Sequence, residues 1–416
     1  MNEKIIVLLI FAGCYSLALS RKVKLAYASL GASALLLASG ILKIEDAVFN
    51  AIKWDVLGIY WGFMMVSFVF MKSRMPDFIA MKLLKLVRVE KYAILSLCAL
   101  TAFLSAFMEN VGVVLIMAPV AITIAKLLNS SLFRYMVAIA ISSNVVTTVT
   151  MVADPPSIIL ALETGMKPLD FYWFNGRPGL GTLTIFGVIA AMSTLLFQFR
   201  NMNKKVEIET EKIYVTKGAS ALFVFGVPAL AIAPELGIKV GIVGFAVGAI
   251  ALYMRRQDIK EMLFEFDWDS FLFIVGIFMV IFSLSASGIL MDFSGFLVKS
   301  GFKDPAFMLA FVTWVSVAAS SFMDNVPYTI LMIPVCRNLA EIIGMSAWPL
   351  LFGMLVGTGI GGNITPVGAA ANVFACGILE KHGYKIVLKE YLKIGVPFSI
   401  AAVATVHILL QIFWLK

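Results

Sequence analysis

Three acidic residues stand well inside apolar stretches of the chain: Glu109, Asp154 and Asp324. An ionised carboxylate at the centre of a bilayer costs about 2.5–3.5 kcal/mol, so embedded acids generally face a polar cavity and serve function. A buried acid can exchange a proton for a cation, because burial favours its neutral form and a bound cation favours its charged form. Asn110 and Asn325 directly follow Glu109 and Asp324 and add carbonyl oxygens, which predicts ion sites, with Na⁺ as a candidate, at both places.

Hydroxyl and amide side chains accompany these acids. They make an oxygen-rich set without thiolates, which suits hard cations or oxyanions. The further candidate ligands are Asn144, Thr147, Thr148, Thr150, Ser157, Asn363, Thr365 and Asn372.

Each residue type also has a purely structural use, and the sequence leaves both open. Glu109 and Asp324 are suited to capping a helix, and the following asparagines to satisfying the backbone of a turn. Threonines within helices often bond to their own backbone. Asp154 precedes two prolines, so a capping or cavity-lining role competes with a coupling role.

The residues with this chemistry occur twice in the chain. SAFMENVGVVLIMAPV (105–120) returns as SSFMDNVPYTILMIPV (320–335), at an offset of 215 in residue number, and TVTMVADPPS (148–157) aligns with NITPVGAAAN (363–372) at the same offset. WDVLGIYWGFMMV (54–66) matches WDSFLFIVGIFMV (268–280) at an offset of 214. Asp154 aligns with Ala369, so this acid has no acidic counterpart. Paired interrupted segments in corresponding halves are typical of a transporter's binding site.

Composition indicates an integral membrane protein. Apolar residues make up 61% of the 416 residues and charged residues 14%, whereas soluble domains contain about half and a quarter. The four scattered cysteines are expected to be buried apolar side chains (Cys14, Cys98, Cys336 and Cys376). We expect no cleavable signal peptide, because the first apolar stretch, 5–20, lacks a basic flank and a cleavage pattern. Walker, HExxH and GxSxG motifs do not occur, so neither an enzyme activity nor a cofactor is expected.

Hydropathy predicts an all-α polytopic fold of two inverted repeats, 1–200 and 217–416, joined by a linker at 201–216. Each repeat is expected to contain five crossings and one re-entrant helical hairpin. Because five is odd, the second repeat must be inserted upside down. The hairpins are predicted at 92–127 and 307–343, broken helices at 134–165 and 347–380, scaffold helices at 1–75 and 217–289, and single helices at 178–199 and 392–413.

Basic residues predict the orientation. Of the 33 lysines and arginines, 23 fall in or beside 21–24, 72–91, 126–134, 200–217, 255–260 and 381–393, which indicates that this side is cytoplasmic. The linker 200–217 of a cell-membrane protein would then be cytoplasmic, with both termini outside. This distribution accounts for the net charge of +8, so no nucleic-acid partner is expected. The stretches 72–91 and 255–260 are interpreted as topology signals rather than lipid head-group sites.

At these motifs the chain resembles the ion transporter superfamily, in the branch of arsenite efflux permeases, bacterial sodium/proton antiporters and the melanosomal P protein. Citrate and dicarboxylate carriers are more distant relatives. The most specific motifs are FMDNVPYTILMIP (322–334) and GGNITPVGAAANV (361–373). The chain departs from the branch at Ala153, Ser157 and Glu109, where Gly, Asn and Asp or Asn are usual. The resemblance implies a scaffold domain, usually dimeric, and a transport domain of hairpins and broken helices that moves as an elevator.

Three functions remain open at this point. The favoured one is a secondary transporter that exchanges a small ion, sodium or arsenite/antimonite, for protons, with Asp324 and Glu109 as the titrating groups. The alternative is a sodium-coupled symporter of a citrate-like or inorganic anion, in which helix N-termini bind the anion. An ion channel of the same architecture is the third.

Overall fold

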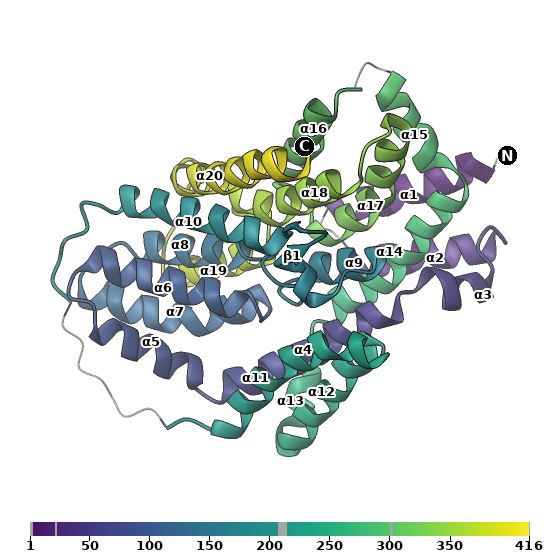
Figure 1. Ribbon diagram of the computed structural model, residues 1–416. Helices are drawn as coiled ribbons and strands as arrows, with labels where there is room; N and C mark the ends of the chain where they lie inside the picture. The colour runs from purple at the N-terminus through teal and green to yellow at the C-terminus, as the bar shows by residue number, and fades with distance from the viewer. Residues whose placement is uncertain (1–2, 21–22, 207–213, 300–302, 416) are drawn as a thin grey trace.

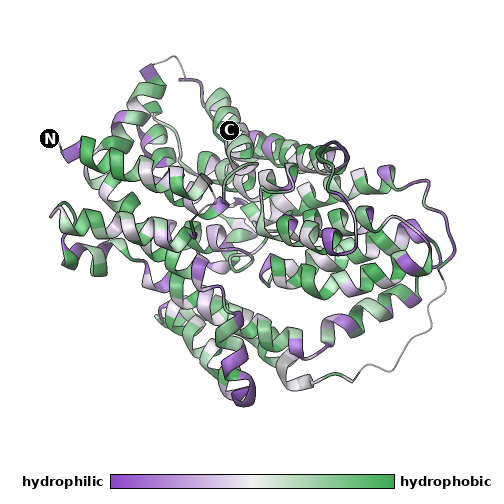
Figure 2. Cartoon of the chain, turned by 180° about the vertical axis from the view of Figure 1, so that it is seen from behind, coloured by the Kyte–Doolittle hydropathy of each residue, from purple (hydrophilic) through white to green (hydrophobic). Residues whose placement is uncertain are grey.

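The computed structural model describes residues 3–20, 23–206, 214–299 and 303–415. Arg21, Lys22 and part of the predicted linker, 207–213, lie outside the described residues. The described chain is helical almost throughout, and Figure 1 shows long helices packed side by side. Hydrophobic residues cover most helices, and hydrophilic residues gather mainly at helix ends and in loops (Figure 2).

The first half contains α1 (Glu3–Ser20), α2 (Leu25–Ala38), α3 (Ile44–Asp46), a π-helical turn η1 (Ala47–Ala51), α4 (Trp54–Lys72), α5 (Met75–Lys85), α6 (Glu90–Ser105), α7 (Asn110–Leu127), α8 (Leu132–Asn144), α9 (Pro155–Thr164), η2 (Pro168–Phe171), β1 (Trp173–Phe174), β2 (Arg177–Pro178) and α10 (Leu180–Gln198). The second half contains α11 (Lys217–Ile232), η3 (Ala233–Leu236), α12 (Val240–Met254), η4 (Arg256–Asp258), α13 (Ile259–Glu265), α14 (Trp268–Ala286), α15 (Ile289–Lys299), α16 (Pro305–Ser320), α17 (Asn325–Ile343), α18 (Trp348–Gly361), η5 (Gly362–Ile364), α19 (Ala370–Lys381) and α20 (Leu388–Trp414).

The same series of long helices occurs in both halves. The first residues of α4 and α14, and of α5 and α15, are related by the offset of 214 found in the sequence. Those of α6 and α16, α7 and α17, and α9 and α19 are related by the offset of 215. The chain leaves the helical conformation at corresponding places, between α6 and α7 and between α16 and α17, and again between α8 and α9 and between α18 and α19.

Several helices have the length that a bilayer requires. Among the described residues, six helices are long and apolar enough to cross a membrane: α4, α7, α10, α14, α17 and α20. The chain is therefore a multi-pass membrane protein.

The most extensive contacts between the two halves are made by α4 with α12, by α14 with α2 and by α10 with α20. A Cβ atom at Gly62 would lie 1.9 Å from the carbonyl oxygen of Gly244, so the backbones of α4 and α12 touch. In the second pair, the Ser33 hydroxyl donates to the carbonyl oxygen of Gly276 at 2.9 Å. Small residues at such interfaces allow the close helix approach that stabilises packing within a bilayer.

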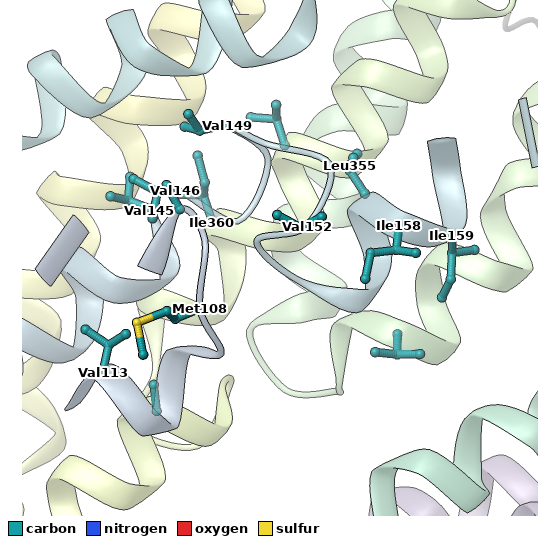
Figure 3. Packing of buried hydrophobic residues seen from close by; sticks show 14 of the residues in the cluster. Met108, Val113, Val145, Val146, Val149, Val152, Ile158, Ile159, Leu355 and Ile360 are labelled. Carbon is teal, nitrogen blue, oxygen red and sulfur yellow. The ribbon is translucent and has the colours of Figure 1, made fainter. Parts of the chain in front are cut away.

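Two helices form the centre of a second group. Every residue of α18 from Pro349 to Gly361 is buried, and α8 is buried apart from Arg134. Contacts with α6, α7 and α19 surround α8, and contacts with α16, α17 and α20 surround α18. The valines of the break after α8, among them Val145 and Val146, belong to the same buried cluster as Ile360 of α18 (Figure 3).

The structure adds elements that hydropathy did not predict. Besides the short helices α3, α5, α13 and α15, the chain forms a two-stranded antiparallel hairpin, β1–β2, in an otherwise helical fold. Asn175 and Gly176 make its turn with φ of 49° and 75°. This conformation is the one that an Asn-Gly pair favours. The four cysteines are buried and free, as predicted.

Candidate functional site

Four helices begin at the interruptions, and three of them have an acidic residue at the N-cap. Glu109 caps α7, where its carboxylate accepts hydrogen bonds from the N–H groups of Val111 at 3.0 Å and Gly112 at 2.8 Å. Asp324 caps α17 through the N–H of Val326 at 2.9 Å. The structural use that the sequence left open therefore applies to both acids. It does not preclude ion binding, because the positive end of a helix N-terminus is itself an ion-binding device.

The two remaining N-cap residues have different side chains, although their backbone dihedral angles are similar. Asp154 precedes α9 with φ −156° and ψ 149°, and Ala369 precedes α19 with φ −141° and ψ 148°. The side chain of Asp154 makes no capping bond to its own helix. A carboxylate is thus present at three of the four helix starts, and the fourth has only a methyl group.

Asp154 instead pairs with the start of α17. The Asn325 Nδ2 group donates to Oδ2 of Asp154 at 2.7 Å and joins the start of α17 to the start of α9. Asn110 occupies the matching position on α7, which contacts α19. Its partner position there is Ala369. The Oδ1 atom of Asn110 is buried and accepts no hydrogen bond from the residues that the structure describes, which leaves one carbonyl oxygen available for a ligand.

Two cavities adjoin these helix starts. The Asp324 cavity, of about 720 Å³, is lined by Asp324 and by Gly368, Ala369 and Ala370 of the second broken segment. The Glu109 cavity, of about 410 Å³, lies between α4 and the start of α7. Val111 and Phe374 line both cavities, so the two are neighbours.

A third, much smaller space links two of the acids. It measures about 20 Å³ and is lined by both Glu109 and Asp154, which is room for about one water molecule or a small ion. Asp154 is also bonded to Asn325, the residue that follows Asp324. Within the described residues, no three His, Cys, Asp or Glu side chains are grouped as a metal site. The three carboxylates are therefore neighbours that do not share one tight metal centre.

Two predicted ligands hold the turns between the helices. The Thr150 hydroxyl donates to the carbonyl oxygen of Ala106, and the Thr365 hydroxyl donates to that of Ser321. These bonds are equivalent, because the offset of 215 relates Ala106 to Ser321 as well as one threonine to the other. One bond joins the segment between α8 and α9 to the end of α6, and the other joins the segment between α18 and α19 to the end of α16.

A second equivalent pair closes the broken segments themselves. Ser157 donates to the carbonyl oxygen of Thr147 at 2.6 Å, and Asn372 donates to that of Gly362 at 2.9 Å. Both side chains are fully buried. In the three cavities described above, neither side chain is part of the lining.

The remaining predicted residues bond to the surrounding helices, and Asn144 and Asn363 connect the two halves. Asn144 donates to the side-chain oxygens of Asn363 at 2.9 Å and Asn372 at 3.1 Å, and Asn363 donates to the backbone of Ile141. Thr148 shares a 2.8 Å hydrogen bond with Thr184 of α10. The structure thus places Glu109, Asp154 and Asp324 in the cavity linings. Asn110 and Asn325 directly follow two of these acids but are not part of those linings. The other predicted residues bond within the supporting framework, apart from Thr147, whose hydroxyl has no partner among the described residues.

Residues remote in sequence also line the Asp324 cavity. Tyr15 of α1 lines it and donates from its hydroxyl to the carbonyl oxygen of Pro327 at 2.9 Å. Lys24, Asp269 and Lys381 add charged groups to the lining. The repeat contained no signal for Tyr15, because the matching residue at an offset of 214 is Ala229.

The fold is similar to that of a solved transporter. The YdaH transporter of Alcanivorax borkumensis superposes with a TM-score of 0.62 over 98% of this chain and 98% of its own, at 12% sequence identity. At this identity the similarity shows the shared fold alone.

Relatives of known sequence include one that is named as a transporter. The chain is 27% identical to the P protein of Mus musculus over 93% of its own length, but it spans only 58% of that protein. It is 25% identical to an uncharacterised transporter of Mycobacterium tuberculosis strain H37Rv, Rv2685, over 99% of this chain and 98% of the relative. The family model described as "Citrate transporter" matches residues 6–357. The chain therefore belongs to the citrate transporter family of membrane carriers.

Proposed function

We propose that this carrier is a secondary active transporter that exchanges a small inorganic ion, sodium or arsenite/antimonite, for protons. The observation that carries the proposal is the placement of three carboxylates at helix starts around adjoining cavities, with Asp154 and Asn325 bonded at 2.7 Å. Acids that sit beside helix N-termini can hold either a proton or a cation, and the occupancy of one excludes the other.

In this proposal the residues have distinct roles. Glu109 and Asp324 release and take up protons as the ion binds and leaves. Asn325 holds Asp154 in place, and the Oδ1 atom of Asn110, which accepts no bond within the described chain, offers a neutral ligand. Thr150 and Thr365 fix the turns that carry these groups.

We further infer an elevator mechanism in a cell-membrane protein built from two inverted repeats. The α6–α7 and α16–α17 pairs would be the re-entrant hairpins, and α8–α9 and α18–α19 the broken helices that move with them. The scaffold would be a homodimer formed by 1–75 and 217–289, with the linker 201–216 in the cytoplasm. Lys24 and Lys381 of the Asp324 cavity belong to the basic side, so the cavity would open to the cytoplasm.

The test is proton-coupled flux in proteoliposomes. Glu109→Gln, Asp154→Asn and Asp324→Asn should each lose the proton movement that follows addition of sodium or arsenite. Asp292→Asn is the matched control, since Asp292 is an exposed acid on α15 paired with Lys4 at 2.6 Å. Full proton-coupled flux in both Glu109→Gln and Asp324→Asn would refute the proposal. Flux without any counter-ion dependence would indicate a channel.

A separate observation supports a second candidate function. The start of α19 lacks an acid at Ala369, lines the Asp324 cavity and shares that cavity with Lys24 and Lys381. A helix N-terminus without a carboxylate attracts anions, so sodium-coupled symport of a citrate-like or inorganic anion fits this end of the cavity. Sodium-dependent uptake of labelled citrate, succinate or sulfate would support this function, and its absence for all three would remove it.

A further inference from the structure

The short helix α5 has one face buried in the protein and one face exposed. Pro76, Ala80 and Leu84 recur at intervals of four and are buried, and α5 contacts α4, α6 and α7, beside which it lies in Figure 1. The exposed face contains Phe78 and Lys82. At 11 residues, α5 is about 16 Å long and cannot cross a bilayer core of about 30 Å.

The basic residues of this face lack acidic partners within the part of the chain that the structure describes. There, Lys82, Lys85 and Arg88 are not within 4 Å of any carboxylate, whereas Lys72 and Arg74 pair with Glu261 and Asp77. Leu86 beside them is 78% exposed. Cations that are free of acids and lie next to exposed apolar side chains are typical of a helix in the interface of an anionic membrane.

The equivalent helix in the other half keeps only one of the two lysines, Lys299 at the position of Lys85. In α15 the residues Leu290, Ser294 and Val298 form the same buried stripe, each at the offset of 214 from its counterpart in α5. The position of Lys82 is occupied by Phe296, and that of Phe78 by Asp292. The basic face is therefore a property of one member of the pair and does not follow from the shared fold.

We propose that the exposed face of α5 binds anionic phospholipid. Lys82 and Lys85 would contact the phosphate groups, with their aliphatic stems and Phe78 and Leu86 against the acyl chains. Because α5 connects α4 to α6, a bound lipid would anchor the junction between the helix pair that contains α4 and the helices of the candidate site. The two lysines are thus more than topology signals.

The experiment measures lipid binding to the purified full-length chain by native mass spectrometry. Phosphatidylglycerol and phosphatidylcholine are titrated onto the unmodified protein, onto the double variant Lys82→Gln/Lys85→Gln, and onto Lys299→Gln. Lys299 is the matched control because it is the counterpart of Lys85 on α15, at the same offset of 214. A lysine near an anionic surface contributes about fivefold to binding, so the double variant should bind phosphatidylglycerol roughly 25-fold more weakly.

The expected pattern is selective. Phosphatidylglycerol should bind more tightly than phosphatidylcholine, the double variant should lose that preference, and Lys299→Gln should retain it. Equal binding of the two lipids, or an undiminished preference in the double variant, would overturn the proposal. If the double variant does not fold, the salt dependence of the unmodified protein decides. Raising the ionic strength should weaken phosphatidylglycerol binding, and a salt-independent preference would also overturn it.

Discussion

The hydrogen bond between Asn325 and Asp154 makes the charge state of Asp154 measurable. We consider Asn325→Ala, Asp154→Ala and the double variant, which together isolate the interaction between the two side chains. The N–O distance of 2.7 Å is at the short end of the range for a charge-assisted bond. Hydrogen bonds to charged groups contribute about 1.5–3 kcal/mol, whereas side-chain hydrogen bonds within membrane proteins average about 0.6 kcal/mol.

The assay is reversible unfolding of the four proteins in mixed micelles. For an ionised Asp154 the coupling free energy should be at least about 1.5 kcal/mol. The control cycle combines Asn325→Ala with Asp292→Ala, whose carboxylate pairs with Lys4 instead, and should be additive within about 0.5 kcal/mol. A coupling near about 0.6 kcal/mol would mean that Asp154 is protonated in the resting protein. A coupling of zero would refute the bond and with it the role of Asn325.

Three further predictions concern the framework. Thr150→Val and Thr365→Val each remove the donor that holds a helix turn, so each should lower the free energy of unfolding by about 1 kcal/mol or more, measured in micelles. Gly62→Ala places a Cβ against the backbone of the facing helix α12 and should destabilise the protein by about 1–3 kcal/mol, seen as a lower melting temperature. Lys53→Glu should disrupt the 3.1 Å ion pair with Glu163, which joins the start of α4 to the end of α9. This loss should change the transport rate by up to about fivefold. The charge swap Lys53→Glu/Glu163→Lys should restore the transport rate.

Each of these predictions has a control. Thr123→Val removes a donor that bonds to its own helix at Pro119 on an exposed face, so it should cost much less than either buried threonine. Gly13→Ala adds a Cβ with no atom within 4 Å and should leave the melting temperature unchanged. A charge swap that fails to recover the rate would show that the ion pair does not influence the transport cycle.

The positions of the helix interruptions could be predicted from the sequence because they depend on local signals. Asp154 before two prolines favours a helix interruption, and α9 does begin at Pro155. In the second half the glycines from Gly357 do not end the helix: α18 continues to Gly361, and the interruption lies between Gly361 and Ala370. The short helices α5 and α15 were not predicted, since each has only 11 residues and is too short to cross a bilayer. The Asn175-Gly176 hairpin was also missed, although that dipeptide is a known turn signal.

The candidate site was predicted only in part. An acid within an apolar stretch needs a polar environment in any fold, so Glu109, Asp154 and Asp324 could be identified from the sequence alone. A threonine or asparagine has many ways to satisfy its hydrogen bonds, and the sequence does not specify which carbonyl it will meet. Thr150, for example, bonds to Ala106, and this depends on the packing of segments 44 residues apart. The contribution of Tyr15 depends on a contact over 312 residues, which no local pattern encodes.

The pairing of α2 with α14 has a consequence for biosynthesis. The Ser33 hydroxyl reaches its acceptor on Gly276 across 243 residues, so α2 enters the bilayer long before its partner has been translated. At about 5–20 residues per second the delay is on the order of 10 to 50 s. During that time the small and hydroxylated face of α2 meets lipid or the insertion machinery. A nascent chain released before α14 emerges would lack this partner, and the face of α2 that packs against α14 would remain exposed to quality-control proteases.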